Sequence, residues 1–576
     1  MLWKEKVDKW HNSNAVPIYL KEELESLNSD ILFDSFYRYL EFGTGGMRGE
    51  IGPGTNRINL VMIRRVTVAL ANYILANDGQ SAGVVIAYDN RHFSKEFAEE
   101  TAKVFAYYGV KVYLSDFIRP TPIVSLAVRE FKAFAGVMIT ASHNPKQYNG
   151  YKIYDASGGQ ITLETANEIT KILNEIEDET DLDFDLDNQG ISNLINHFGS
   201  EIDELYLSKL RTVTVNTDLV KDEGEKVKIL YTPLHGSGQY LVLNGLLEAG
   251  FLDSHLLQEQ ADYDSNFSTV DYPNPEEAEV FQLAIQKGDV ISADILLATD
   301  PDSDRLGVAV RNGLRYQLLT GNEIGVLMLY YLAQHNQLAN SQVVKTIVTS
   351  DLGKKIAKAY QLNMTETLTG FKFIGGKIED FEQSKLPFLF GYEESYGYLI
   401  KPYVRDKDAI QAAILLAEMA LFYKLKNKTL LDVLDEIAKE YGYYKEELVT
   451  KTYYGAEASQ FLVEQMSYIE ANLPSYIGEM QVVRVQNYNK SLDLDVMSGV
   501  TKDIQLPQSN VLKLFLEDDS WVCIRPSGTE PKCKVYFSVN GRSQSEASEK
   551  LTQLSTDFLV YFEDVSRLLA TRKTKR

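Results

Sequence analysis

Three aspartates occupy alternate positions in the segment "ATDPDSDRLG" (298–307): Asp300, Asp302 and Asp304. The segment follows an apolar run that predicts a β-strand, so the three carboxylates should leave the strand end together. Carboxylates this close repel one another and need a cation, and hard oxygen ligands suit Mg²⁺ or Ca²⁺. An EF-hand loop is excluded, because Arg305 stands where that loop has its invariant glycine. The segment predicts a Mg²⁺ site that shares a phosphate oxygen, with Arg305 facing the same phosphate; a solvated acidic turn is the alternative.

A serine and a histidine stand side by side after another apolar run, in "GVMITASHNPKQYNG" (136–150). A serine hydrolase needs a base within hydrogen-bond reach of the hydroxyl. We expect the side chains of Ser142 and His143 to point apart as they leave the strand, and no G-x-S-x-G elbow surrounds the serine. Esterase chemistry is therefore disfavoured. Either Ser142 does other chemistry, or it and Asn144 satisfy a turn before Pro145.

A third loop, "RPSGTEPK" (525–532), has the composition of a phosphate site. Its hydroxyls and consecutive backbone amides form a nest-like arrangement for anions, and its arginine offers a planar fork for bidentate phosphate binding. The alternative is a hairpin turn between two strands. The candidate phosphate ligands are Arg525, Ser527, Gly528 and Thr529.

A fourth loop, "FGYEESYGY" (390–398), places Glu393, Glu394 and Ser395 after an apolar strand. Carboxylates accept hydrogen bonds from vicinal hydroxyls such as those of a sugar, although a solvated turn explains the segment equally well when it is taken alone. With the serine and the aspartates, these loops form one consistent set for phosphoryl transfer on a sugar. A phosphate ester on serine hydrolyses extremely slowly without a catalyst, so Ser142 could carry a phosphoryl group until a sugar hydroxyl is placed in line.

The composition narrows the class of protein. The chain has 576 residues, enough for about three to five domains. Its 58 basic and 81 acidic side chains give a net charge of −23, which argues against a nucleic-acid or membrane-surface binder but not against a small anionic substrate. The two cysteines, Cys523 and Cys533, are too few for a disulfide framework and are interpreted as small buried side chains in a reducing compartment. The longest apolar stretch, from Ala409, is interrupted by polar residues and is interpreted as a buried helix, so we expect a cytoplasmic protein.

Short β-rich runs alternate with helical periodicity along the chain, the pattern of α/β domains. One such unit is "GVVIAYD" (83–89) followed by a helix to about Tyr108, which Ser94 can cap. Loops at the carboxyl ends of strands form the ligand crevice of an open α/β sheet, so the candidate loops should converge. The acidic run 174–193 is interpreted as a solvated linker or surface excursion, and a change of character after Gly442 marks a last domain from about 443.

Four motifs, in the same order, resemble the α-D-phosphohexomutase superfamily: "TASHNP" at 140–145, "DPDSDR" at 300–305, "GYEESYG" at 391–397 and "RPSGTEP" at 525–531. The stretches "FGTGGMRGEIGPGTNRIN" and "YTPLHGSG" are similar to the phosphoglucomutase-2-like branch. This branch includes bacterial phosphoglucomutases, phosphopentomutases and a glucose 1,6-bisphosphate synthase. The resemblance implies an α/β fold of four domains around a central cleft, the first three with related mixed α/β sheets and the fourth a smaller α+β domain. We place the domains at 1–212 (phosphoserine), 213–317 (metal), 318–442 (sugar recognition) and 443–576 (phosphate binding).

The resemblance also implies roles for individual residues. Ser142 would be the phosphoserine and would share one Mg²⁺ with the three aspartates. Lys152, His143 and Arg48 match active-site positions of the superfamily, and which of Lys152 and His143 moves the proton stays open. Substrate binding would fall to Arg305, Thr369, Gly370, Lys372, Glu393, Ser395, Lys407, Arg525, Ser527, Gly528 and Thr529.

The implied activity is that of a phosphoglucomutase, which interconverts α-D-glucose 1-phosphate and glucose 6-phosphate after priming by glucose 1,6-bisphosphate. Many superfamily members have histidine after "TG" in the third domain, where this chain has Phe371 and Lys372. The choice of glucose therefore rests on the branch, and activity on pentose or mannose phosphates stays an alternative. A Mg²⁺-dependent phosphatase and a non-catalytic sugar-phosphate binder are disfavoured, the latter because the serine and all three aspartates are present. The expected partners are small sugar phosphates, with neither nucleic acid nor membrane.

Overall fold

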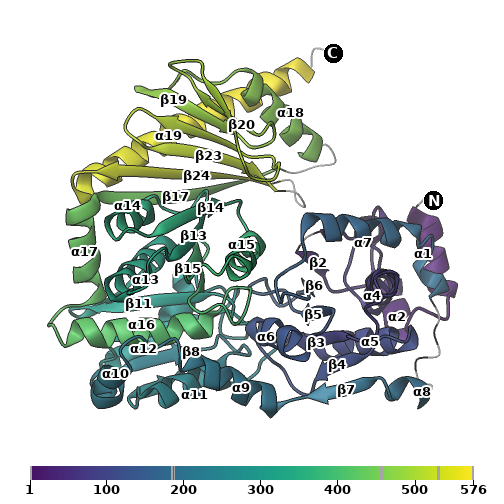
Figure 1. The fold of residues 1–576 in the computed structure, drawn as a ribbon. Helices are drawn as coiled ribbons and strands as arrows, with labels where there is room; N and C mark the ends of the chain where they lie inside the picture. Colours follow the sequence, from purple (N-terminus) through teal and green to yellow (C-terminus); the bar gives the residue numbers. More distant parts are fainter. Residues whose placement is uncertain are drawn as a thin grey trace. The chain divides into compact units, whose positions relative to one another are not determined.

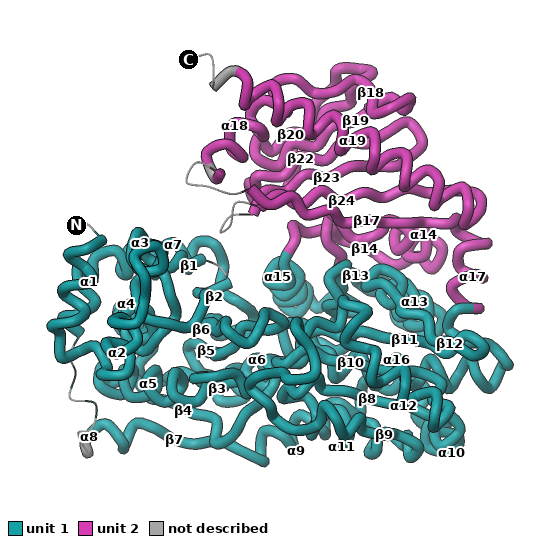
Figure 2. Tube along the Cα trace, turned by 180° about the vertical axis from the view of Figure 1, so that it is seen from behind, with its two compact units in different colours: residues 1–344, 370–431 teal, residues 345–369, 432–576 magenta. Residues whose placement is uncertain are grey.

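The computed structural model describes residues 3–43, 45–182, 184, 186, 189–453, 458–527 and 532–573. Figure 2 shows the two compact units into which the chain divides. Unit 1 comprises residues 1–344 and 370–431, and unit 2 comprises residues 345–369 and 432–576.

A seven-stranded mixed sheet forms the N-terminal part of unit 1 (Figure 1). The order is β1 (Phe42–Gly43), β2 (Gly46–Glu50), β6 (Tyr148–Asp155), β5 (Ala135–Ile139), β3 (Val84–Tyr88), β4 (Val112–Ser115) and β7 (Ile195–Phe198). Strands β5, β3, β4 and β7 run parallel, and β6 and β2 are antiparallel to their neighbours. Every residue of β3 and β5 is buried, as expected for central parallel strands.

Helices cover this sheet and share its hydrophobic core. Side chains of α4 (Leu60–Ala76), α5 (Ser94–Tyr107) and α7 (Leu163–Glu175) join those of the strands in one cluster. The prediction that Ser94 caps α5 is wrong. The cap position is Phe93, with a left-handed φ of 64°, and the Ser94 hydroxyl instead donates to Asp89 Oδ1 at 2.6 Å.

Three N-terminal helices, α1 (Trp3–Asn12), α2 (Ile18–Ser26) and α3 (Ser29–Phe36), pack around a core of their own that includes Trp10. The indole of Trp10 donates to Glu179 Oε1 at 2.6 Å, and the hydroxyl of Tyr39 donates to Glu179 Oε2 at 2.8 Å. Glu179 is therefore buried, at 2 % exposure, within the run that was expected to be solvated. That expectation is wrong at this residue, because charge density does not reveal that one carboxylate has buried donors.

A five-stranded mixed sheet follows in unit 1. Its order is β12 (Arg315–Leu318), β11 (Leu306–Asn312), β10 (Ile295–Thr299), β8 (Ile229–Thr232) and β9 (Ser254–Leu256). As in the first sheet, the strands at the centre are parallel and a pair of strands is added antiparallel. The nearby helices are α9 (Ser200–Leu210), α10 (Thr217–Glu223), α11 (Gln239–Ala249) and α12 (Gln282–Ile291).

The remaining part of unit 1 contains an antiparallel strand pair and a buried helix. Strand β15 (Phe388–Glu393) pairs with β16 (Gly397–Leu399). Helix α16 (Ala409–Lys424) is buried over nearly its whole length, which confirms the interpretation of the apolar stretch. Asp408 caps α16 by accepting from Ile410 N and Gln411 N, both at 3.0 Å. The helices α13 (Gly321–His335) and α15 (Phe371–Gln383) also belong to unit 1.

Unit 2 is built on one large antiparallel sheet. Its main path is β17 (Tyr443–Thr452), β24 (Lys532–Gly541), β23 (Trp521–Pro526), β22 (Leu512–Leu516), β19 (Met480–Asn487), β20 (Leu492–Asp495) and β21 (Thr501–Asp503), and β18 (Tyr476–Ile477) pairs with β19. Helices α18 (Ala458–Ala471) and α19 (Gln544–Lys573) supply side chains to its core. The segment 345–369, with α14 (Leu352–Ala359) and β14 (Asn363–Thr367), clusters with this unit. Among the described residues, no helix combines the length and the apolar character needed to cross a bilayer.

Candidate active site

Ser142 lies in the turn that follows β5, and its side chain faces the aspartate loop. Its backbone has a left-handed φ of 52°, and the residue is 3 % exposed. The hydroxyl Oγ donates to Asp300 Oδ2 at 2.7 Å and lies 3.2 Å from His143 Nδ1. The expectation that the two adjacent side chains point apart is wrong, because the left-handed turn at Ser142 interrupts the alternation of an extended strand.

The three aspartates follow β10 and converge. One carboxylate oxygen of each lies within 4.8 Å of the others, and all three residues are at most 1 % exposed. Asp300 Oδ1 accepts from the backbone N–H groups of Asp304 and Arg305, each at 3.0 Å. Within the described part of the chain, Oδ1 of Asp302 and Oδ1 of Asp304 are buried without a hydrogen-bond partner. Buried carboxylate oxygens without donors fit a cation-binding role.

Two lysines supply positive charge to this cluster. Lys152, on β6, places Nζ 2.7 Å from Asp302 Oδ2 and 3.1 Å from Asp304 Oδ2. Lys407 Nζ lies 3.1 Å from Asp304 Oδ2. Burial opposes the charged form of Lys152, but the two carboxylates outweigh it and raise its pKa. Burial likewise opposes ionisation of Asp304, yet Lys152 and Lys407 lower its pKa far below the ordinary range. Burial also opposes the charged form of Lys407, but Asp304 and other carboxylates raise its pKa, so both lysines are held as ammonium ions.

The main ionic partner of Arg305 is Glu276 and not the aspartate cluster. Its Nη1 forms an ion pair with Glu276, and its Nε lies 4.0 Å from Asp304 Oδ1. Phosphate binding by Arg305 remains a prediction, and Glu276 is a partner that the sequence did not suggest.

Arg48 contacts the serine turn, and His143 lies next to Ser142 Oγ. Arg48 lies on β2, and its Nη1 donates to Asn144 Oδ1 at 2.8 Å, in the serine turn itself. Burial, followed by the charges of Arg305 and Arg48, lowers the pKa of His143 well below its ordinary value. The imidazole is therefore neutral at physiological pH.

The candidate sugar-reading residues include the end of β15. Glu393 is 5 % exposed, and burial raises its pKa to about 7, with Lys407 opposing and Glu394 adding to the shift. The Ser395 side chain hydrogen-bonds to this carboxyl group. A Cβ at Gly397 would lie 2.3 Å from Lys407 Cδ, so the glycine makes room for the lysine. Glu393, Ser395 and Lys407 thus belong to one neighbourhood with Asp304.

Three more predicted residues lie just before α15 or in its first turn. Gly370 precedes the helix with a φ of 117°, a conformation that favours glycine. Lys372 lies in the first turn, with Nζ 4.9 Å from the Phe373 ring centroid. Thr369 belongs to unit 2, and its hydroxyl has no hydrogen-bond partner among the described residues.

The predicted phosphate nest belongs to unit 2. Arg525 lies on β23 opposite Lys534 of β24, and Ser527 N donates to Lys532 O at 2.8 Å. Gly528 and Thr529 lie outside the described residues. Strands β23 and β24 pair antiparallel on either side of this loop, and phosphate binding remains a prediction.

Sequence reasoning missed Thr121, at the start of α6 (Thr121–Phe131). Its hydroxyl donates to Asp302 Oδ2 at 2.8 Å, and its N–H donates to Asp302 O at 2.9 Å. The signal that could have found it is positional, because Thr121 follows the carboxyl end of the parallel strand β4, where ligand loops gather.

The chain is similar to known proteins along most of its length. It matches the phosphoglucomutase/phosphomannomutase alpha/beta/alpha domains I, II and III and the C-terminal domain over residues 39–180, 204–313, 320–441 and 482–551. It is 37% identical over 521 residues to the phosphoglucomutase of Staphylococcus haemolyticus, covering 90% of this chain and 93% of that protein.

Solved structures share the fold. A phosphoglucomutase/phosphomannomutase family protein from Burkholderia thailandensis has a TM-score of 0.65 at 17% identity, covering 91% of this chain and 97% of that chain. The open form of pp63/parafusin from Paramecium has a TM-score of 0.66 at 16% identity, covering 92% and 96%. The prediction of α/β domains with mixed sheets and a smaller C-terminal domain is confirmed.

Proposed function

The chain belongs to the phosphoglucomutase/phosphomannomutase family, and from this premise we propose that it interconverts α-D-glucose 1-phosphate and glucose 6-phosphate through a phosphoserine at Ser142. One observation carries the proposal: Ser142 Oγ is hydrogen-bonded at 2.7 Å to Asp300, within a buried cluster of three carboxylates and two ammonium groups. A serine placed there is suited to carry a phosphoryl group whose charge the surroundings balance.

The aspartate cluster fits one Mg²⁺. The donor set is hard and anionic, and it includes buried oxygens without hydrogen-bond partners. Asp300, Asp302, Asp304 and a phosphoserine oxygen would hold the ion, which would supply charge neutralisation on the phosphoryl oxygens when bound. The protein adds Thr121, which fixes the Asp302 carboxylate through Oδ2.

The transfer itself is a simple exchange at phosphorus. The bond between phosphorus and Ser142 Oγ breaks as a bond to a sugar hydroxyl oxygen forms, and the hydroxyl proton ends, in net terms, on the serine oxygen. The product is a sugar bisphosphate, which must reorient so that its other phosphate can return to Ser142. Little covalent chemistry is required of the protein, so positioning and charge dominate.

The two candidate proton carriers differ in their protonation states. Lys152 is an ammonium ion held by Asp302 and Asp304, so it can donate hydrogen bonds and neutralise charge, but it releases its proton reluctantly and cannot accept another. His143 is neutral, and its Nδ1 lies 3.2 Å from Ser142 Oγ. We assign proton exchange at the serine oxygen to His143 and charge stabilisation to Lys152.

The remaining predicted residues would hold the sugar phosphate. Glu393 and Ser395 would exchange hydrogen bonds with sugar hydroxyls, and Gly370 and Lys372 would contribute from the start of α15. Lys407 and Arg305 would face phosphate oxygens, with Arg305 leaving Glu276. In unit 2, the phosphate that is not being transferred would bind Arg525, Ser527, Gly528 and Thr529, and Thr369 would contact the sugar. Glucose 1,6-bisphosphate would phosphorylate the serine before the first turnover.

The proposal is tested by phosphorus NMR of the protein with Mg²⁺ and a trace of glucose 1,6-bisphosphate. Glucose 1-phosphate, mannose 1-phosphate and ribose 1-phosphate are offered separately. We expect glucose 1-phosphate to be converted to glucose 6-phosphate fastest, and Ser142→Ala to abolish conversion. Preference for ribose 1-phosphate would keep the site and change the substrate. Release of inorganic phosphate without isomerisation would contradict the transfer mechanism.

A further inference from the structure

The segment "YDNRHFS" (88–94), which begins at the last residue of β3, contacts the serine turn, and the proposed transfer gives it no role. The side chains of Asp89 and Arg91 are both 0 % exposed, and Arg91 Nε lies 3.4 Å from Asp89 Oδ2. A buried ion pair contributes little net stability, because desolvation of both charges offsets their attraction. A pair of this kind is better explained by the geometry that it enforces.

The guanidinium of Arg91 gathers the carbonyls of the serine turn. Its Nη1 donates to Pro145 O at 2.8 Å and to Tyr148 O at 3.2 Å. Its Nη2 donates to Ser142 O and to Asn144 O. Four backbone oxygens of one short stretch thus meet a single planar group, which a lysine cannot reproduce with its compact ammonium.

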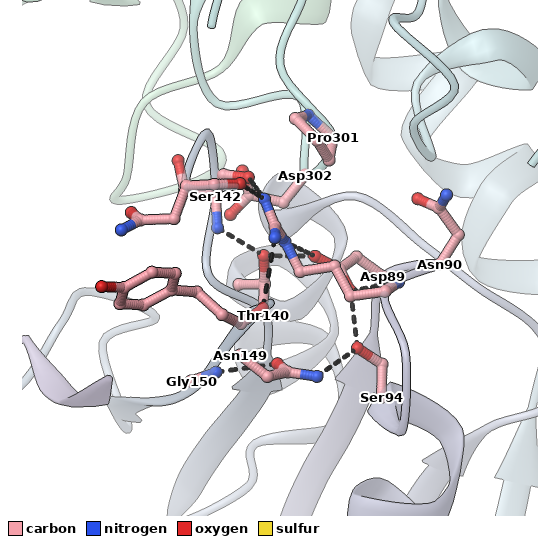
Figure 3. A network of polar contacts seen from close by, with 12 residues as sticks. Asp89, Asn90, Ser94, Thr140, Ser142, Asn149, Gly150, Pro301 and Asp302 are labelled. Carbon is pink, nitrogen blue, oxygen red and sulfur yellow. Dashed lines mark hydrogen bonds and ion pairs between the residues drawn. The ribbon is translucent and has the colours of Figure 1, made fainter. Parts of the chain in front are cut away.

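Asp89 fixes the other side of the turn through Thr140. Asp89 Oδ1 accepts from Arg91 N and from the Ser94 hydroxyl, and Oδ2 accepts from the Thr140 hydroxyl at 2.6 Å. Thr140 Oγ1 in turn accepts from Ser142 N at 2.8 Å. Figure 3 shows this chain of contacts from Ser94 and Asp89 through Thr140 to the backbone of Ser142.

Ser142 is therefore held at both of its backbone polar groups. Its N–H donates to Thr140 Oγ1, and its carbonyl oxygen accepts from Arg91 Nη2. The left-handed backbone at this residue costs about 1 kcal/mol relative to an ordinary conformation, so it persists only where the surroundings enforce it. In this conformation Oγ meets Asp300 Oδ2.

We propose that Arg91, Asp89 and Thr140 are positioning residues for phosphoryl transfer: they enforce the left-handed turn that directs Ser142 Oγ at the aspartate cluster. They act through the serine backbone and do not contact the reacting atoms. This inference rests on the proposed function. It predicts that weakening the support slows the transfer step while leaving sugar binding and overall folding largely intact.

The test compares two variants that break the support with two matched controls. Arg91→Lys keeps the charge and loses the planar fork, and Thr140→Val keeps the shape and loses the hydroxyl. Thr140→Ser keeps that hydroxyl. Arg65→Lys alters another buried arginine, whose Nη2 donates to Leu173 O at 2.8 Å, outside the serine turn.

We expect kcat to fall about 100-fold in Arg91→Lys and about 10-fold or more in Thr140→Val, because a displacement near 1 Å costs about that much. KM for the sugar phosphate should change by less than about threefold, since uniform binding is unaffected. The rate at which glucose 1,6-bisphosphate phosphorylates Ser142 should fall in parallel with kcat. Thr140→Ser and Arg65→Lys should keep the wild-type kcat, and Arg91→Lys should melt no lower than Arg65→Lys.

Two results would overturn the positioning role: a wild-type kcat in Arg91→Lys and Thr140→Val, or a raised KM with kcat unchanged. If Arg91→Lys fails to fold, the Thr140 variants decide: Val replaces the hydroxyl that accepts from Ser142 N by a methyl group, and Ser keeps that hydroxyl and loses only the methyl group. Failure of the proposed function is distinct, since the wild-type protein would then show no mutase turnover at all.

Discussion

The three aspartates of the loop 300–304 have different neighbours, so we expect them to have different roles. Lysine ammonium groups pair with Asp302 and Asp304 but, among the described residues, not with Asp300. Burial, together with the other two carboxylates, raises the pKa of Asp300 well above its ordinary value. Asp300 is also the one that accepts from Ser142 Oγ. We therefore expect a bound cation to stabilise the charged form of Asp300 more than the charged forms of Asp302 and Asp304.

Replacement of Asp300 by asparagine tests this difference. We expect turnover to fall at least about 100-fold, because one proposed metal ligand is lost, and Mg²⁺ should raise the melting temperature less than in the wild type. Without Mg²⁺ the variant should melt no lower than the wild type, because asparagine does not ionise and so avoids the cost that burial and the two neighbouring carboxylates impose on a charge at this position. Asp218→Asn, at an exposed position on α10, is the control for asparagine substitution. Unchanged turnover and an unchanged Mg²⁺ effect in Asp300→Asn would remove Asp300 from the site.

At single residues, the sequence predicts chemical type better than conformation. The spacing of Asp300, Asp302 and Asp304 was enough to predict that they converge. The contact between Ser142 and His143 was not predictable in this way, because it depends on a left-handed turn at Ser142. The backbone of that turn bonds to Thr140, two residues earlier, and to Arg91, 51 residues earlier in the chain.

At the scale of elements, strand ends explain why distant motifs meet. Ser142 follows β5, Asp300 follows β10, and Glu393 ends β15. Alternating β-rich and helical periodicity predicted these strands, and the carboxyl-end rule predicted that the loops gather. Helix starts were less predictable. Serine is a common N-cap residue, but the Ser94 hydroxyl donates to the buried carboxylate of Asp89 and does not cap the helix.

Unit 2 has its own buried ionic cluster, which joins β22 to the segment 345–369. Lys513 on β22 donates to Ile347 O at 2.6 Å, and its Nζ lies 3.8 Å from the Trp521 ring centroid. Burial lowers the pKa of Lys513 to about 8, although Asp351 and Glu366 oppose the shift. The folded unit therefore carries a lysine that is partly neutral at mildly alkaline pH.

The stability of Lys513→Met relative to the wild type should depend on pH. Between about pH 8 and pH 10.5 the unfolded chain binds a proton at Lys513 that the folded chain does not. Wild-type stability should therefore rise with pH in this window relative to the variant, by at most about 3 kcal/mol. Urea denaturation at pH 7, 8, 9 and 10 measures the difference, with Lys502→Met on β21 as the control for loss of one lysine charge. A difference that stays constant across this range would contradict the lowered pKa.

At the scale of the whole molecule, the number and type of domains were predictable, but the division of the chain into two compact units was not. The matched family domains number four, as the resemblance implied. The boundaries at 212, 317 and 442 remain predictions. The segment 345–369 falls within the third matched domain but clusters with unit 2, through contacts such as that of Lys513 with Ile347, which are 166 residues apart. Periodicity describes local elements and carries no information on contacts at that separation.

In the proposed reaction, Ser142 carries the phosphoryl group between the two ends of one sugar. The most direct measurement is a single turnover. The protein is phosphorylated with glucose 1,6-bisphosphate, separated from small molecules, and mixed with Mg²⁺ and glucose 6-phosphate, and the phosphorylation of the Ser142 peptide is followed by mass spectrometry. We expect Ser142 to be phosphorylated at the start and to lose its phosphate as glucose 1,6-bisphosphate appears in equal amount. Phosphate on another residue, or its loss as inorganic phosphate without bisphosphate, would exclude Ser142 as the phosphoryl carrier.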